Sequence, residues 1–156
     1  MRIKIIVVGK TKERYLFQGE QEFLERLKPF AQVEIVVLKD EAITKSIPGE
    51  KVMKKEGERI LRALRKDDFV IALDREGEML SSEGIAAFLE KRKNTGESNL
   101  VFIIGGALGL SPEVLEKANF QLSLSSLTFT HQMTRLILLE QIYRVFSILA
   151  GTEYHK

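Results

Sequence analysis

Few side chains in this 156-residue chain could perform covalent or acid–base chemistry. The absence of cysteine excludes disulfides, thiolate metal ligands and a cysteine nucleophile. The two histidines, His131 and His155, are too few for a histidine-rich metal site, so we expect no metal. An ordinary helix cap and a frayed chain end would also explain these two histidines. Loops that could bind a ligand are therefore the next candidates.

Two glycine-containing patterns resemble nucleotide-binding motifs, and both are incomplete. Gly9-Lys10-Thr11 resembles the end of a P-loop, but Lys4 occupies the position of the first P-loop glycine. We therefore exclude ATP or GTP hydrolysis. The dinucleotide fingerprint G-x-G-x-x-G is also absent, which argues against ordinary NAD enzymes and against methyltransferases with glycines after their first strand.

Gly105 and Gly106 follow a late apolar run in the sequence. Glycine lets the backbone approach a ligand closely, and open α/β sheets bind ligands where strands end. This pattern is consistent with a ligand-binding turn, and equally with a simple tight turn between strand and helix.

A hydroxyl-rich, uncharged segment follows the last predicted strand. It comprises Leu124, Ser125, Ser126, Leu127, Thr128 and Phe129. Backbone amides, hydroxyls and apolar side chains together suit a neutral adenine ring and its ribose. An ordinary serine-rich loop is the alternative.

The charge of the chain is nearly balanced, with 24 Lys and Arg against 22 Asp and Glu and a net charge of +2. This balance alone does not indicate a nucleic-acid partner. Basic residues gather along residues 54–66 and 91–93, but glutamates interrupt the first group. Solvated helix faces are the simpler explanation, and contact with phosphates is the alternative.

Alternating strand and helix patterns must position these segments. Short β-branched runs predict buried strands, at residues 3–8, 33–38, 69–73, 100–104 and 120–124. A tight turn through Gly77 should follow the third strand. Helical spacing predicts one helix after each strand, with Ser82 capping the third, Ser111-Pro112-Glu113 starting the fourth and the fifth spanning about 131–150. The pattern predicts one domain, residues 1–156, of α/β class with a mostly parallel sheet and helices on both faces.

Apolar residues cover almost the whole circumference of the predicted final helix. A helix on the surface of a monomer needs only an apolar stripe of about 100°. A helix at the centre of the core is one explanation, and a homodimer interface is the one we favour.

The start of the chain has an apolar run too short for a secretory signal and no cleavage site. No stretch approaches the roughly 20 apolar residues that span a bilayer. We therefore expect a soluble cytoplasmic protein with no membrane partner.

The chain closely resembles the bacterial ribosomal large-subunit pseudouridine N3-methyltransferases, small members of the SPOUT class. The resemblance rests on motifs spread over the whole chain: Val8-Gly9-Lys10, Lys55-Glu56-Gly57, residues 101–106, Gly109-Leu110, residues 122–129, His131, Arg135, residues 140–144 and Tyr154-His155-Lys156. Its C-terminal third is the most specific part.

The resemblance implies S-adenosylmethionine (SAM) as cofactor, a C-terminal deep trefoil knot and a homodimer. A knot would not be expected from chain physics, since threaded connections are rare. In similar proteins the cofactor contacts match Leu73, Gly105 and residues 124–129. Similar proteins usually have proline where this chain has Thr130, a difference that concerns the rigidity of the knot loop.

The implied reaction is methylation of N3 of a pseudouridine in 23S rRNA, on the assembled ribosome. That nitrogen must lose its proton, and a cation beside the flanking carbonyl oxygens favours the ionised form. We assign this role to Arg144, and we expect Arg135 and Tyr154 to contact the substrate. His155 is the candidate proton acceptor, because an unperturbed histidine is largely neutral near pH 7. Water or hydroxide is the alternative acceptor.

Two other functions remain open at this stage. A tRNA methyltransferase of the same class would keep the fold and the cofactor, but the additional RNA-binding domains of those enzymes are absent here. A non-catalytic nucleotide-sensing module would bind SAM without transferring its methyl group.

Overall fold

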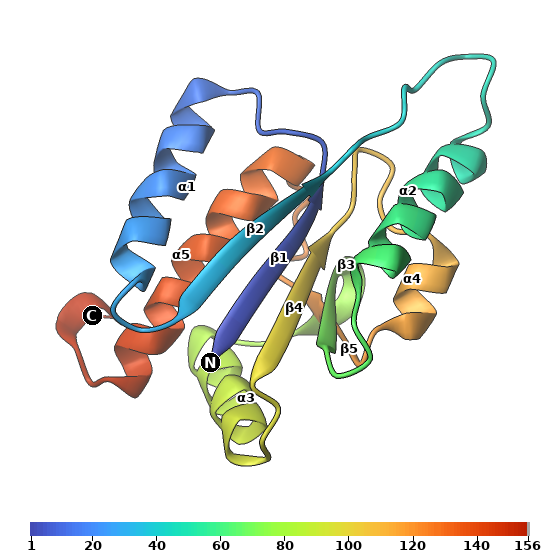
Figure 1. Cartoon of the computed structure of the whole chain (residues 1–156). Helices are drawn as coiled ribbons and strands as arrows, with labels where there is room; N and C mark the ends of the chain where they lie inside the picture. Colours follow the sequence, from blue (N-terminus) through green and yellow to red (C-terminus); the bar gives the residue numbers. More distant parts are fainter. Residues whose placement is uncertain (156) are drawn as a thin grey trace.

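Five parallel strands form a single sheet in the order β2-β1-β4-β3-β5 (Figure 1). The structure is a computed structural model that describes residues 1–155, except for the side chain of His155. The strands are β1 (Arg2–Val8), β2 (Gln32–Leu38), β3 (Phe69–Met79), β4 (Asn99–Ile104) and β5 (Phe120–Ser123). The predicted α/β class with a parallel sheet is confirmed.

Helices cover both faces of this sheet, as predicted. They are α1 (Arg14–Leu27), α2 (Gly49–Ala63), α3 (Ser82–Asn94), α4 (Pro112–Lys117) and α5 (His131–Leu149), followed by the short 3₁₀ helix η1 (Glu153–His155). Helices α1, α3 and α5 pack in the core on one face, and α2 and α4 in the core on the other (Figure 1). Within residues 1–155, no helix is long and apolar enough to cross a bilayer.

The continuous apolar runs of the strands explain why helices cover both faces of the sheet. Ile3, Ile5 and Val7 of β1 pack in the core beneath α1, α3 and α5. Ile6 and Val8 point the other way, into the core beneath α2 and α4. Because successive side chains of a strand face opposite sides, only a sheet buried on both faces suits such a run.

Hydroxyl caps fix the starts of three helices. The Ser111 Oγ accepts a hydrogen bond from the Val114 amide at 3.4 Å, with Pro112 as the first helical residue, as predicted. The prediction of Ser82 as a cap was wrong by one residue, since the Ser81 Oγ accepts from the Gly84 amide. Both serines satisfy the chemistry of a cap, so the sequence pattern alone could not distinguish them.

Thr130 caps α5 in the same way. Its Oγ1 accepts a hydrogen bond from the Met133 amide at 3.2 Å. Proline has no hydroxyl and could not make this contact. The residue that departs from the usual pattern of similar proteins therefore supplies a helix cap of its own.

Strand β3 is longer than predicted. It continues past Leu73 to Met79, and both Leu73 and Glu78 pair with Leu122 of β5. The intervening residues form a bulge in which Gly77 lies against β5, because a Cβ there would be 2.7 Å from the Gln121 carbonyl carbon. The predicted turn through Gly77 is thus a bulge within a continuing strand, and it displaces Asp74 and Arg75 from the sheet.

Helix α5 packs between α1 and α3. Leu138, Leu139, Ile142 and Val145 are buried in the core. A Cβ on Gly19 of α1 would lie 2.9 Å from a methyl group of Leu136, so α1 and α5 approach closely. This central position accounts for part of the apolar circumference of α5, and several of its other apolar side chains stay only half-buried.

Candidate functional site

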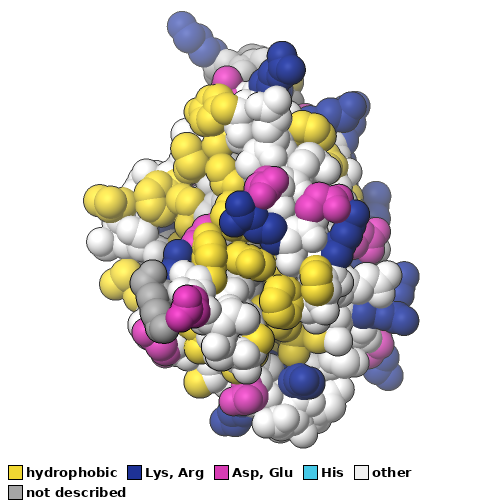
Figure 2. Space-filling view, turned by 90° about the vertical axis from the view of Figure 1, so that its left-hand side faces the viewer, with side chains coloured by type: hydrophobic (Ala, Val, Ile, Leu, Met, Phe, Trp, Pro, Cys, Tyr) yellow, Lys and Arg dark blue, Asp and Glu magenta, His cyan; other side chains and the backbone are white. Residues whose placement is uncertain are grey.

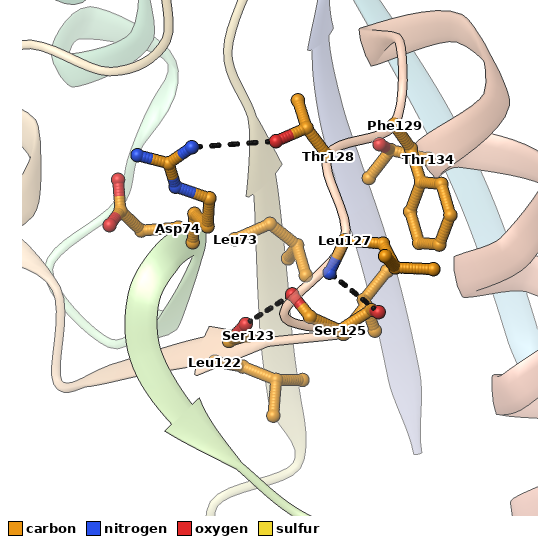
Figure 3. Close-up of a pocket in the computed structure, with 11 residues that line it drawn as sticks. Leu73, Asp74, Leu122, Ser123, Ser125, Leu127, Thr128, Phe129 and Thr134 are labelled. Atoms are coloured by element: carbon orange, nitrogen blue, oxygen red, sulfur yellow. Dashed lines mark hydrogen bonds between the residues drawn. The ribbon is translucent and has the colours of Figure 1, made fainter.

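A cleft opens where the parallel strands end. Its larger part is a cavity of about 970 Å³, lined by segments that follow β1, β4 and β5, by the β3 bulge and by the first turn of α5. Its smaller part, about 130 Å³, is lined by Leu122 of β5, the β3 bulge and the loop after β5 (Figure 3). The two parts share Leu73, Asp74, Arg75, Thr128, Phe129 and Thr134, and we call them together the cleft.

The three predicted strand exits converge on this cleft. Among the predicted cofactor-binding residues, those that line it are Leu73, Gly105, Leu124, Ser125, Leu127, Thr128 and Phe129. Ser126 is exposed and lines neither part. Segments more than fifty residues apart in sequence therefore meet at one edge of the sheet.

The loop after β5 is held in shape by its own hydroxyl groups (Figure 3). The Ser123 Oγ donates a hydrogen bond to the Ser125 carbonyl oxygen at 3.0 Å, and the Ser125 Oγ accepts from the Leu127 amide at 3.0 Å. Arg75 Nη1 donates across the smaller pocket to the Thr128 Oγ1 at 3.4 Å. The hydroxyl-rich composition thus shapes a loop around a cavity, as an Asx-type or serine turn does.

The loop after β4 is a tight glycine turn. The Gly109 amide donates a hydrogen bond to the Gly106 carbonyl oxygen at 3.1 Å, and Gly109 has φ +88°. A Cβ on Gly105 would lie 2.7 Å from the Gly109 carbonyl carbon, so only glycine fits there. The sequence prediction left open whether these glycines form a turn or a ligand site, and the turn is itself part of the cavity wall.

Glu56 of α2 packs against this turn. Its side chain is buried, and a Cβ on Gly106 would be 2.6 Å from the Glu56 Oε2. Its Oε1 accepts a hydrogen bond from the Glu41 amide at 3.2 Å. Burial raises the pKa of the Glu56 carboxyl, because the charged form is poorly solvated there. One buried carboxyl thereby contacts both the turn after β4 and the loop after β2.

His131, the first residue of α5, also lines the cavity. Burial lowers the pKa of its imidazole, and the nearby positive charge of Arg135 lowers it further. The neutral form of His131 is therefore favoured near pH 7. Sequence reasoning explained His131 as a cap and missed its place in the cavity, although its position directly after the hydroxyl-rich loop was a signal.

Other cavity residues had no sequence signal strong enough to identify them. Asp74 and Arg75 lie in the β3 bulge. Glu13 directly precedes α1, and Tyr15 lies in its first turn. The sequence pattern predicts a tight turn at the bulge, and such a turn does not by itself indicate a ligand site.

Arg135 lies beneath the cleft and does not line it. Its side chain is 1% exposed, with Nη2 donating to the Val8 carbonyl oxygen at 2.7 Å and Nη1 donating to the Thr11 Oγ1 at 3.0 Å. The Thr11 hydroxyl donates in turn to Glu20 at 2.6 Å. Burial raises the pKa of Glu20, a shift that Thr11 and Arg135 oppose. A direct contact between Arg135 and a substrate would require this network to open.

Arg144 and Tyr154 lie at the other end of α5. Arg144 Nε donates to Glu140 at 3.1 Å, the Tyr154 hydroxyl donates to the same carboxylate at 3.2 Å, and the guanidinium lies 4.9 Å from the centre of the Tyr154 ring. Arg144 lies thirteen positions after His131 in the same helix, about 20 Å along the axis. Within one chain, Arg144 is therefore remote from the cleft. The side chain of His155 lies outside the part of the chain that the structure describes.

Metal chemistry has no candidate site in the described structure. Among residues 1–155, no group of three or more His, Cys, Asp or Glu side chains could hold a metal ion. The cleft is lined by Glu13, Asp74, Arg75 and His131, beside apolar side chains, hydroxyl groups and backbone.

Comparison with known proteins agrees with this geometry. A family model described as "Predicted SPOUT methyltransferase" matches residues 1–155. Proteins named ribosomal RNA large subunit methyltransferase H are similar over 100% of both chains, from Symbiobacterium thermophilum at 53% identity, Carboxydothermus hydrogenoformans at 52% and Halothermothrix orenii at 50%. A match of this extent shows common ancestry over the whole described chain. The chain therefore belongs to the SPOUT methyltransferase family.

Proposed function

We propose that this chain is a SAM-dependent methyltransferase that methylates N3 of a pseudouridine in 23S rRNA, acting on the assembled ribosome. The observation that carries the proposal is the convergence of Leu73, Gly105 and residues 124–129 on one cleft in a member of this family. The names of the full-length relatives supply the substrate class. A ribosomal substrate implies action in the cytoplasm.

The cleft has the size and the lining that SAM requires. A cavity of about 970 Å³ is at the upper end of the range for small-ligand sites. Leu73, Leu124 and Phe129 offer apolar surface for an adenine ring, and Ser125 and Thr128 offer hydroxyl groups for a ribose. Gly105 keeps the turn after β4 free of a side chain. When bound, SAM supplies an electrophilic methyl group on a sulfonium centre.

We assign the cation beside the reacting base to Arg144 of the partner subunit. Its positive charge near the carbonyl oxygens that flank N3 would favour loss of the N3 proton. Glu140 and the ring of Tyr154 hold the guanidinium in a defined orientation. A preoriented cation loses little freedom when the substrate arrives. We further assign Tyr154 to substrate contact and His155 to proton acceptance, both from the same subunit as Arg144.

A homodimer would bring the two halves of this site together. Hydrophobic side chains gather on the face where α1, α5 and the C-terminal end lie, with charged groups among them (Figure 2). Several apolar side chains of α5 are only half-buried in the single chain. An antiparallel pairing of two α5 helices would place Arg144 of one subunit near the first turn of α5 in the other. We also propose that residues 1–156 form one domain whose C-terminal part is threaded as a trefoil knot, as family membership supports.

Arg135 has a positioning role in this proposal. Its buried guanidinium fixes the start of α5 relative to the end of β1. The first turn of α5 and Glu13, in the connection after β1, line the cleft. Contact with the substrate, which the sequence resemblance implied, would therefore be indirect.

The decisive experiment uses ribosomes from a strain that lacks this modification. Incubation with methyl-labelled SAM, digestion to nucleosides and mass analysis should identify methylpseudouridine in 23S rRNA. Whole ribosomes should be methylated faster than purified rRNA. Label in tRNA alone would identify a different substrate class, and SAM binding without any transfer would identify a sensing module. Either result would contradict the proposal.

A further inference from the structure

The connection between β1 and α1 forms one margin of the cleft. Glu13 of this connection and Tyr15 of α1 line the larger cavity, whereas Lys10 and Thr11 line a separate cavity together with Arg135. We call residues 10–14 the basic lip, because Lys10, Lys12 and Arg14 are exposed there. The reaction proposed above assigns no role to the charged side chains of the basic lip.

The backbone of the basic lip is fixed by side chains of two helices. Gln132 of α5 accepts hydrogen bonds through its Oε1 from the Lys12 amide at 2.7 Å and from the Glu13 amide at 3.4 Å. The Thr11 hydroxyl accepts from Arg135 and donates to Glu20 of α1. Hydrogen bonds from two helices thus hold the backbone of this segment in place.

The cations of the basic lip are not neutralised within the described chain. Arg26, Arg59 and Arg144 each pair with a glutamate. Lys10, Lys12 and Arg14 make no ion pair with any residue among 1–155, and Glu13 is the one acid between them. The basic lip therefore combines a rigid backbone with free positive charges beside the cleft.

We propose that the basic lip binds the phosphate groups of the rRNA strand that flank the target nucleotide. This inference rests on the function proposed above. A net charge of +2 is too small for the whole protein to attract RNA strongly, so attraction must come from a local group of cations. Lysine and arginine contacts to phosphate position a nucleic acid without reading its sequence. A rigid lip would thus place the target base over the cleft at a small cost in conformational entropy.

A charge-matched pair of variants tests this role. The lip variant carries Lys10→Gln, Lys12→Gln and Arg14→Gln. The control variant carries Lys91→Gln, Lys93→Gln and Lys117→Gln, which are exposed residues in the last turns of α3 and α4, at the opposite edge of the sheet. Both variants lose three positive charges from exposed positions, so the fold and the net charge are matched.

The initial rate of methyl transfer is measured as a function of ribosome concentration at saturating SAM, at several salt concentrations. It is also measured as a function of SAM concentration at saturating ribosomes. The lip variant should raise the KM for ribosomes about tenfold and make log KM less dependent on log salt by about two units, as expected for three lost phosphate contacts. Its KM for SAM should equal that of the wild type. The control variant should match the wild type in all three quantities.

Three results would overturn the inference. Equal effects in the lip and control variants would show a dependence on net charge alone. A higher KM for SAM in the lip variant would assign the basic lip to the cofactor cleft, and a changed oligomeric state in size-exclusion chromatography would assign it to a contact between subunits. If the wild type methylates no ribosomes, the function proposed above fails first, and that outcome is distinct from these three.

Discussion

Arg135 Nη2 donates a hydrogen bond to the carbonyl oxygen of Val8 at 2.7 Å, although 127 residues separate the two in sequence. Val8 is the last residue of β1, and Arg135 lies in the second turn of α5. The contact joins the first strand to the helix that follows the last strand. The first turn of α5 and the connection that follows β1 both contribute residues to the cleft lining, so one buried guanidinium sets the relative position of two of its walls.

Replacement of Arg135 should therefore lower the free energy of unfolding much more than an average substitution does. Arg135→Met leaves the Val8 carbonyl oxygen unpaired and removes the positive charge near the buried Glu20. We expect a loss of about 3 kcal/mol in the free energy of unfolding, because an unpaired buried carbonyl and an uncompensated buried charge both destabilise the folded state. Urea denaturation at a fixed protein concentration measures it, since dimerisation would make stability depend on concentration.

The double variant Arg135→Met with Glu20→Gln separates charge from packing. If the buried Glu20 charge causes much of the loss, the double variant should lose less free energy than the sum of the two single variants. Strict additivity would show that the two side chains do not interact, contrary to the network described here.

Gly105→Ala should weaken SAM binding without unfolding the protein. The new Cβ would lie 2.7 Å from the Gly109 carbonyl carbon, so the turn after β4 must shift. We expect at least a tenfold higher Kd for SAM by isothermal titration calorimetry, about 1.4 kcal/mol. Gly84→Ala is the matched control, because its Cβ would have ordinary contacts at 3.4 Å in the first turn of α3. Equal Kd values for the two variants would exclude this turn from the cofactor site.

His131 should titrate below the ordinary histidine pKa near 6.5. Burial and the charge of Arg135 lower its pKa in the folded protein, and Asp40 opposes them only in part. Between the folded pKa and about 6.5 the unfolded chain binds more protons than the folded one, so stability rises with pH through this window. The contribution of His131 is complete above pH 6.5 and is lost as the pH falls through the folded pKa.

NMR of histidine ring carbons measures this pKa directly. The two histidines can be assigned with the variant His155→Gln, which retains only the His131 signal. A His131 pKa above 6.5 would contradict the buried, neutral imidazole in the cavity.

The strand and helix positions could be predicted because local patterns determine them. The β-branched runs of β1 and β4 and the Ser111-Pro112 start of α4 depend on neighbouring residues alone. The order of strands in the sheet could not be predicted, because it depends on pairing between segments far apart. The end of β3 was misjudged for the same reason, since Asp74 and Gly77 resemble a turn until β5 pairs on both sides of them.

The candidate site was predictable only in part. Strand exits identify the cleft because parallel strands end at one edge, and this located Gly105 and residues 124–129. The burial of Arg135 had no sequence signal, because arginine is rarely buried and its partner is a backbone carbonyl. The distance of Arg144 from the cleft of its own chain follows from the length of α5. Which cleft it completes depends on the proposed partner subunit, whose position the sequence of one chain does not indicate.

The central claim is that the cleft of one subunit is completed by Arg144 of the partner subunit. It is tested by a mixed dimer, purified through two affinity tags, that pairs an Arg144→Ala subunit with a Gly105→Ala subunit. At a SAM concentration far below the Kd of the Gly105→Ala variant, each parent homodimer should have low activity. Arg144→Ala should lower kcat about 100-fold and leave the Kd for SAM unchanged.

The mixed dimer contains one intact cleft facing one intact Arg144, so its methyl-transfer rate on ribosomes should recover to roughly half that of the wild type. A mixed dimer as inactive as its parents would show that Arg144 acts within its own chain or outside the reaction, and would contradict the composite site.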